Sequence, residues 1–334
     1  MTRIRGDDAR LTWDGVISVE HTPSGTRGWR LPHERIDLFP DGDLAQRAAM
    51  QAGVRVRLGT DARTVVGRAT VAGLADEARV DAVVGNELVA SASVTPQGDF
   101  VLDDLPAGDE SIEVWLPQFG EFRLRELTVD DDARVWRAPP LAQRRLVTYG
   151  SSITQCRTAA SPAQTWPALL ARRFDLDLTC LGFGGQCHLD PLVAHEIGAL
   201  APDVVTMCVG INIYGSATFS ARSLLPAILG FVTTVRESSP TVPILMISPI
   251  GSPERETTPN AVGLTLVQIR SQVAEAVRLL RKHGDENLHL LDGLDVLPLE
   301  RADRLDDGLH PDAEGYRLMA EAIGPRVESL LQTS

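Results

Sequence analysis

The stretch of sequence that decides the fold is LVTYGSSIT, residues 146–154. It begins as a mostly apolar run, which a glycine and two serines follow at 150–152. Further continuous apolar runs lie at 178–181, 204–209, 244–247 and 288–291. Strands that are buried on both faces have this appearance, and the glycine and serines are typical of the loop that follows such a strand. The second half of the chain is therefore expected to contain five buried strands.

Longer amphipathic stretches alternate with these runs. They lie at 163–173, 190–200, 221–237 and 262–282, and the last follows the final run at 313–331. Buried strands joined by helices form a parallel sheet with a helical layer on each face. We predict an α/β fold over residues 145–334, a three-layer α/β/α domain of the flavodoxin-like type.

The first half of the chain has a different periodicity. Apolar and polar residues alternate in short runs at 16–20, 54–58, 122–127 and 133–136, and turn signals such as Thr22–Gly25 and Pro96–Asp99 separate such runs. Period-two alternation with frequent turns is typical of an antiparallel sandwich of half-buried strands. We predict a jelly-roll-like β-sandwich, similar in fold to carbohydrate-binding modules, over residues 1–144, with 137–144 as its linker.

Composition excludes several classes of partner. The chain has 334 residues, with 45 Asp and Glu against 32 Lys and Arg, a net charge of -13 and no basic cluster. Phosphate backbones and anionic lipid surfaces would repel such a chain, so we expect neither nucleic acid nor membrane as a partner. The N-terminus lacks an apolar signal segment, and the four cysteines lack metal-ligand spacing, which favours reduced, buried thiols in a cytoplasmic protein.

Chemically capable side chains follow the predicted strands. Ser152 follows the first strand, Gly185 the second and Asn212 the third, while Asp307 and His310 precede the last helix. Ligands bind at the carboxyl ends of the strands in sheets of this kind, so these residues are expected to share one rim. Each alone is a weak signal, because a serine after a strand usually caps a helix. Together they supply the nucleophile, base and oxyanion donors that acyl transfer requires.

The order of these residues resembles the SGNH or GDSL hydrolase family across about 190 residues. The family's first block, Gly-Asp-Ser, is matched with Ser151 in place of the aspartate, a departure that we expect to alter hydrogen bonds in the loop. The second block places its glycine at Gly185, with Gly184 as the competing register. The remaining blocks fall on Gly210 and Asn212, and on Asp307, His310 and Pro311.

The resemblance implies a role for each matched residue. Ser152 would attack an ester carbonyl, and His310, oriented by Asp307, would accept and return the proton. The backbone N–H groups of Ser152 and Gly185 and the amide of Asn212 would bind the oxyanion. This chemistry implies no metal and no cofactor.

Apolar residues near the matched blocks predict the lining of a substrate pocket. Ile153, Phe183, Ile213, Tyr214 and Met246 would make the rim of the site apolar, which suits an acyl or aromatic group. For each residue singly, packing in the core is an equally good interpretation.

The pair Cys187-His188, beside the second block, has a less favoured catalytic interpretation. It could suggest a thiol nucleophile or a metal ligand, but a second Cys/His pair at ligand spacing is lacking. His188 and Asp190 could instead line the pocket.

The first half of the chain is similar to that of two groups within this family. These are carbohydrate esterases and the GDSL-type salicylyl acyltransferase of tetracycline biosynthesis, and the segments 29–35 and 48–55 look more like the second. Trp13, Trp29, Trp115 and Trp136 could stack on sugars, although core packing is the better interpretation.

The function predicted from the sequence is that of a serine esterase acting through an acyl-enzyme on a small-molecule or sugar ester. One alternative is an acyltransferase that passes the same acyl group to a hydroxyl of a carbohydrate or other natural product. Another is a non-catalytic carbohydrate-binding protein on a degenerate esterase scaffold. The sequence does not decide the oligomeric state.

Overall fold

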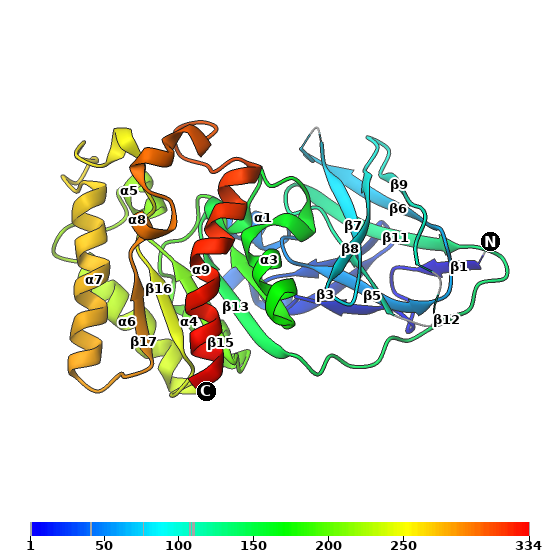
Figure 1. Ribbon diagram of the computed structural model, residues 1–334, viewed down its shortest axis with the longest axis horizontal. Coiled ribbons are helices and arrows are strands. Elements are labelled where there is room, and N and C mark those ends of the chain that lie inside the picture. Colours follow the sequence, from blue (N-terminus) through cyan, green and yellow to red (C-terminus); the bar gives the residue numbers. More distant parts are fainter. Residues whose placement is uncertain (1, 41, 76, 107, 109–110, 334) are drawn as a thin grey trace. The chain divides into compact units, whose positions relative to one another are not determined.

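The computed structural model describes residues 2–40, 42–75, 77–106, 108 and 111–333 (Figure 1). The chain divides into two compact units. The first consists of Met1–Gln143 with Ala159–Cys180, and the second of Arg144–Thr158 with Leu181–Ser334. The predicted division into sequential domains at residue 144 stays a prediction. The segment 159–180 lies beyond that boundary in the sequence but clusters with the first unit.

The first unit contains the predicted sandwich of two antiparallel sheets. One sheet has the order β3 (Ser18–Thr22), β4 (Gly25–Trp29), β11 (Glu121–Val129), β6 (Val65–Ala72) and β9 (Asp99–Leu102), with β1 (Thr2–Arg5) beside β11. The other has the order β12 (Val135–Trp136), β5 (Arg55–Thr60), β10 (Ser111–Trp115), β7 (Arg79–Val84) and β8 (Glu87–Ser93), with β2 (Thr12–Asp14) beside β5.

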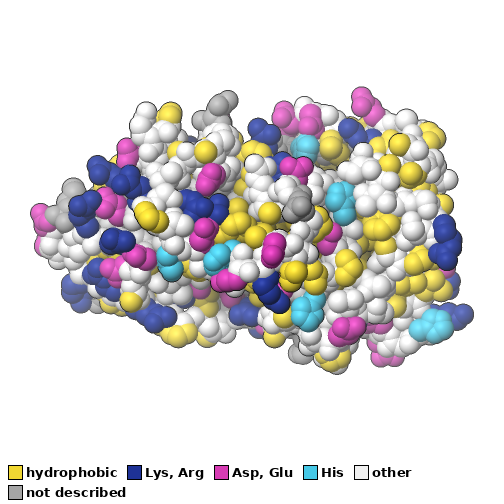
Figure 2. Space-filling view, turned by 180° about the vertical axis from the view of Figure 1, so that it is seen from behind, with side chains coloured by type: hydrophobic (Ala, Val, Ile, Leu, Met, Phe, Trp, Pro, Cys, Tyr) yellow, Lys and Arg dark blue, Asp and Glu magenta, His cyan; other side chains and the backbone are white. Residues whose placement is uncertain are grey.

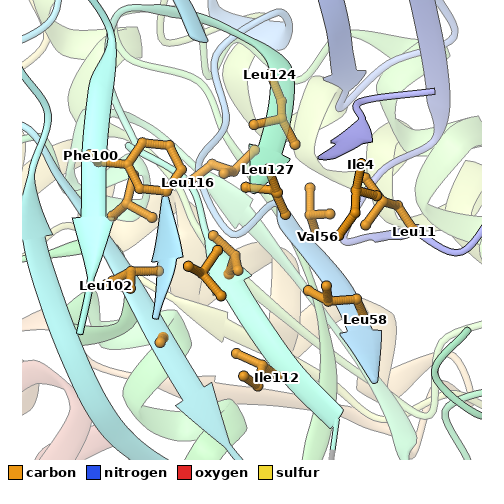
Figure 3. Close-up of a cluster of buried hydrophobic side chains, with 14 of the residues drawn as sticks. Ile4, Leu11, Val56, Leu58, Phe100, Leu102, Ile112, Leu116, Leu124 and Leu127 are labelled. Atoms are coloured by element: carbon orange, nitrogen blue, oxygen red, sulfur yellow. The ribbon is translucent and has the colours of Figure 1, made fainter. Parts of the chain in front are cut away.

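The core of the sandwich follows from the alternation in the sequence. In β11, the even-numbered residues Phe122 and Leu124 are buried, and after them the odd-numbered residues Leu127 and Val129 are buried instead. A register shift between Leu124 and Glu126 inserts one extra residue and so returns the apolar side chains to the interior. Figure 3 shows Leu124 and Leu127 in the cluster that they form with residues of the other strands.

The parallel sheet has the strand order β14 (Leu176–Gly182), β13 (Arg144–Gly150), β15 (Val204–Cys208), β16 (Ile244–Ile247) and β17 (Leu288–Leu291). These are the five strands predicted from the apolar runs. Every residue of β15 and β16 is buried, which confirms that both faces of these strands are covered. The α/β prediction for this region is therefore confirmed.

Helices alternate with the strands in the predicted places along the chain. They are α3 (Trp166–Phe174), α4 (Pro191–Ala199), α6 (Leu224–Ser238), α7 (Leu266–Lys282) and α9 (Ala313–Thr333). The helix α6 contacts both α4 and α7, so these three form one layer, and Figure 1 shows α9 crossing a face of the sheet.

Short helices complete the described part of the chain. They are η1 (His33–Leu38), α1 (Asp43–Ala48), α2 (Ser152–Gln155), η2 (Pro162–Gln164), α5 (Ile211–Ser216), η3 (Pro253–Arg255), α8 (Gly293–Val296) and η4 (Leu299–Arg304). Helical periodicity cannot reveal elements of three to six residues, so the sequence did not predict them. Two of them, α2 and α5, carry candidate site residues in their first turn.

The surface is mixed in character. None of the helices in the described ranges has the length and apolar composition that a bilayer crossing requires. On the face drawn in Figure 2, acidic and basic side chains are interspersed with apolar ones.

Candidate active site

Ser152 is the first residue of α2, directly after the strand β13. Ser151 is the N-cap of this helix, and its side-chain hydroxyl accepts a hydrogen bond of 3.2 Å from the N–H of Ile153. The hydroxyl at this position thus caps the helix, as serine commonly does. The Oγ of Ser152 lies 2.8 Å from Nε2 of His310.

Asp307 accepts hydrogen bonds from both the backbone and the ring of His310. Its Oδ1 accepts the N–H of His310 at 2.7 Å, and its Oδ2 lies 2.7 Å from Nδ1 of the same residue. Because an ionised carboxylate only accepts, Nδ1 carries the proton. The other nitrogen of the neutral ring is then free to accept the hydroxyl proton of Ser152.

The Asp307 carboxyl group stays ionised in this arrangement. Partial burial of the group opposes ionisation, but hydrogen bonds from the backbone and the ring of His310 outweigh it and lower the pKa of Asp307 to about 2. The carboxylate therefore keeps its charge, and its hold on the imidazole, throughout the neutral range.

The loop that carries Asp307 and His310 is fixed from both sides. The carbonyl of Gly308 accepts hydrogen bonds from the Ser252 hydroxyl at 3.0 Å and from Nη1 of Arg255 at 3.2 Å. The carbonyl of Pro311 accepts one from the Thr158 hydroxyl at 2.8 Å. The histidine is thus presented by a braced segment rather than by an isolated turn.

The loop after β14 distinguishes the two glycines of the second block. The N–H of Gly184 donates to Oε1 of Gln155 at 2.8 Å and is therefore occupied. Gly185 has a φ of 76°, and its N–H has no acceptor among the described residues. The N–H of Ser152 likewise has none in the described part of the chain. Sequence reasoning missed Gln155, because one polar residue in a short helix forms no motif.

Asn212 has an amide of defined orientation. Its Oδ1 accepts a hydrogen bond from the N–H of Cys187 at 3.0 Å, so its Nδ2 is the donor end of the amide and points away from this bond. Gly210 precedes α5 with a φ of 124°, and a Cβ there would lie 2.5 Å from Pro249. This position needs glycine both for its conformation and for its close approach to the neighbouring loop.

The predicted apolar rim is not where the structure places most of its members. Ile153, Phe183, Ile213 and Met246 are all at most 1% exposed, whereas Tyr214 is partly exposed. These four side chains pack into the interior, because residues at strand ends and in first helical turns also face the core. The Tyr214 hydroxyl donates to the carbonyl of Thr258 at 3.0 Å.

The prediction that the cysteines are buried is confirmed. Cys156, Cys180, Cys187 and Cys208 are all buried. Burial raises the pKa of Cys187 far above its ordinary value and that of Cys208 to about 12, so both thiols stay protonated. A protonated thiol is neither a nucleophile nor a metal ligand. Within the described ranges, no three His, Cys, Asp or Glu side chains gather in a group that could hold a metal ion.

Two family models match the chain. The model of the GDSL-like Lipase/Acylhydrolase family matches residues 148–318, and that of the SsfX3 N-terminal domain matches residues 11–125. No protein of curated function matches the sequence.

Solved structures resemble the chain over nearly its whole length. The salicylyl-acyltransferase SsfX3 from a tetracycline biosynthetic pathway is 31% identical, with a TM-score of 0.90 over 98% of this chain and 97% of that one. A Bacteroides ovatus protein that is named as a GDSL-like lipase is 19% identical, with a TM-score of 0.83 over 99% and 98%. A family two carbohydrate esterase from Clostridium thermocellum is 17% identical, with a TM-score of 0.68 over 96% and 99%.

Proposed function

Since the chain belongs to the GDSL-like lipase/acylhydrolase family, we propose that it is a serine esterase whose nucleophile is Ser152. The observation that carries this proposal is the chain of short contacts from Ser152 Oγ to His310 Nε2, at 2.8 Å, and from His310 Nδ1 to Asp307 Oδ2, at 2.7 Å. This is the geometry that general-base activation of a hydroxyl requires.

Acylation proceeds by attack of Ser152 Oγ on the ester carbonyl carbon. His310 Nε2 takes the hydroxyl proton as the new C–O bond forms, and the carbonyl oxygen becomes negatively charged. When the tetrahedral intermediate collapses, the bond to the leaving alcohol breaks and His310 gives that alcohol its proton. Water then repeats the sequence on the acyl-enzyme, which releases the acid and restores Ser152.

Three donors are available to the oxyanion. The N–H groups of Ser152 and Gly185 have no acceptor among the described residues, and the Asn212 amide is oriented by its bond to Cys187. Donors held in place before the reaction stabilise the developing charge without reorganisation. Open donors beside an activated hydroxyl are what acyl transfer needs.

The proposed substrate is a small-molecule or sugar ester. Of the five apolar residues proposed for the pocket, Tyr214 is the one whose side chain is partly exposed. We therefore narrow the proposed substrate contact to Tyr214.

The test is hydrolysis of a short-chain aryl ester by Ser152→Ala. We expect turnover to fall to the background rate, and a fluorophosphonate probe to label the native protein at Ser152 and to leave this variant unlabelled. The matched control is Ser271→Ala, which changes an exposed serine on α7 and should leave turnover and labelling unchanged. Turnover retained by Ser152→Ala would overturn the proposal.

Acyl transfer to an alcohol is the second candidate. It is favoured by the 31% identity over 98% of the chain to a protein named as a salicylyl-acyltransferase. The acyl-enzyme would be the same, and an acceptor hydroxyl of a natural product would replace water. Incubation with an aryl ester and a panel of alcohols separates the two, since a transferase gives more new ester than free acid when the alcohol is dilute.

Sugar binding by the tryptophans of the sandwich has less support. The guanidinium of Arg27 lies 4.3 Å from the ring centroid of Trp29, and His33 stacks on this ring at 6.1 Å. Trp115 is 2% exposed and lies beside Arg55. Because other side chains cover the faces of these two rings, neither tryptophan offers an open face on which a sugar could stack.

We also propose a reducing, cytoplasmic location. It is supported by the burial of all four cysteines, which is usual for thiols that stay reduced. Fractionation of the producing cells tests it, and activity found in the culture medium would contradict it.

A further inference from the structure

His188 has a place in the site that the proposed mechanism does not use. Its Nε2 lies 2.9 Å from the carbonyl oxygen of Gly185, and its Nδ1 lies 2.8 Å from the Thr218 hydroxyl. The ring therefore joins the loop after β14 to the segment that follows α5.

The chemistry of the two contacts fixes their direction. A carbonyl oxygen only accepts, so Nε2 of His188 carries a proton and donates it to Gly185. In the neutral ring, Nδ1 accepts the hydroxyl proton of Thr218. In the charged ring, Nδ1 donates to the same hydroxyl oxygen. Both contacts persist in either charge state.

Gly185 occupies the third position of a tight turn. The N–H of Gln186 donates to the carbonyl of Phe183 at 2.9 Å, and the positive φ of Gly185 is the one that a type II turn requires there. The central peptide of this turn carries the open N–H of Gly185. The peptide groups on either side of it are held by hydrogen bonds. The N–H of Gly184 donates to Gln155, and the carbonyl of Gly185 accepts from His188.

The same ring also holds the segment that bears Asn212. Thr218 follows the end of α5, and its N–H donates to the carbonyl of Ile213 at 3.3 Å. Cys187, which precedes His188 in the sequence, donates its N–H to Asn212 Oδ1 at 3.0 Å. Two adjacent residues thus tie the Gly185 turn to the helix that carries the third donor.

We propose that His188 is a positioning residue that sets the distance and direction of the oxyanion donors Gly185 and Asn212. This inference rests on the proposed function, because it assigns His188 to the same acyl-transfer site. The bonds of the ring go to Gly185 and Thr218 rather than to Ser152. It acts by holding two donor segments together before the charge develops.

The experiment compares His188→Ala and His188→Gln with the native protein on an aryl ester. Truncation should lower kcat about tenfold and change KM less than about twofold, because a misplaced donor costs less than a missing one, which costs about 100-fold or more. Glutamine can place an N–H where Nε2 lies, so it should restore kcat to within about threefold. The rate of fluorophosphonate labelling should fall in parallel with kcat, because the phosphonyl oxygen needs the same donors.

The matched control is His195→Ala, which removes an exposed histidine on α4 and should leave every rate unchanged. Thermal melting separates a loss of fold from a loss of position, and Thr218→Val tests the clamp from its other end if His188→Ala does not fold. A kcat of His188→Ala within about twofold of native, or a loss confined to KM, would overturn the inference. Retained turnover in Ser152→Ala would instead overturn the proposed function, so the two failures are distinguishable.

Discussion

Two sets of polar groups in this protein differ in how completely they are bonded. In the sandwich unit, the buried guanidinium of Arg30 donates to the backbone carbonyls of Met50, Cys180 and Arg47. In the other unit, the backbone N–H groups of Ser152 and Gly185 have no acceptor among the described residues. Gly185 is exposed and Ser152 is half-buried, so both N–H groups are open to solvent or to a bound ligand.

Arg55 is a second buried guanidinium of this unit, although its Nε has no hydrogen-bond acceptor among the described residues. It is 2% exposed, and its guanidinium donates to the carbonyl of Leu178 at 2.7 Å and to the Asp177 carboxylate, and it pairs with Glu113. Such a group is costly to bury and costlier to unpair. The sandwich therefore uses charge for structure, and the Ser152 site uses it for chemistry.

The sharpest test of the comparison is His310→Ala. Loss of the general base should lower turnover by about 10⁴-fold, because the serine hydroxyl is a weak nucleophile without a proton acceptor. The free energy of unfolding should change little, since the ring is partly exposed. Steady-state kinetics and urea unfolding measure the two effects, and His283→Ala, at an exposed position, is the control. A large loss of stability with retained turnover would reverse the comparison.

Arg55→Met should have the opposite profile. The methionine keeps an apolar stem but leaves Asp177 and Glu113 without their cation, so we expect a loss of about 4 kcal/mol in the free energy of unfolding. Urea unfolding measures this loss. The exposed Arg125→Met is the control and should cost under about 0.5 kcal/mol. A cost for Arg55→Met as small as that of the control would show that the buried network contributes no stability.

Asn212→Ala removes one donor and leaves the nucleophile and base intact. Turnover should fall about 100-fold, or about 3 kcal/mol of transition-state stabilisation, with little change in KM. The exposed Asn287→Ala provides the matched control. A loss expressed in KM alone would place Asn212 in ground-state binding instead.

How much the sequence predicts depends on the kind of feature. The five strands of the parallel sheet were predictable, because hydrophobic period is a local property of the chain. Burial on both faces was wrong for β17, where Leu290 is 38% exposed. The bonds from Gln155 to Gly184 and from Cys187 to Asn212 were not, since loop hydrogen bonds leave no pattern. The clustering of the segment 159–180 with the first unit also left no signal in the sequence. Arg30 bonds this segment through the backbone carbonyl of Cys180, and every residue has such a carbonyl, so no residue type marks the contact.

The expected rim of Ile153, Phe183, Ile213 and Met246 shows the same limit. An apolar residue near a strand end is compatible with both a pocket wall and the core, and only packing distinguishes the two. All four are buried, so burial there is set by neighbours that the local sequence does not specify.

The smallest expected effect concerns Glu20, which binds Arg27 at 2.7 Å and Trp29 at 2.9 Å. Burial of the carboxylate opposes ionisation, but hydrogen bonds from Trp29 and Arg27 and the charge of Arg123 outweigh it and lower the pKa of Glu20 from 4.5 to about 2. Because the folded pKa lies below the ordinary one, this group stabilises the fold above about pH 4.5. That contribution is lost as the pH falls through about 2.

Glu20→Gln should therefore flatten the pH dependence of stability in this window. After allowance for solvent screening, we expect the variant to lose about 1 kcal/mol of unfolding free energy at pH 6 and almost none near pH 2. Urea unfolding across this range measures the effect, and Glu237→Gln, at an exposed position, should follow the native curve. Aryl-ester turnover at pH 7 should be unchanged, because the bonds of Glu20 to Arg27 and Trp29 lie within the first unit. Reduced turnover in a folded Glu20→Gln protein would show that the bonded and the open polar groups are coupled.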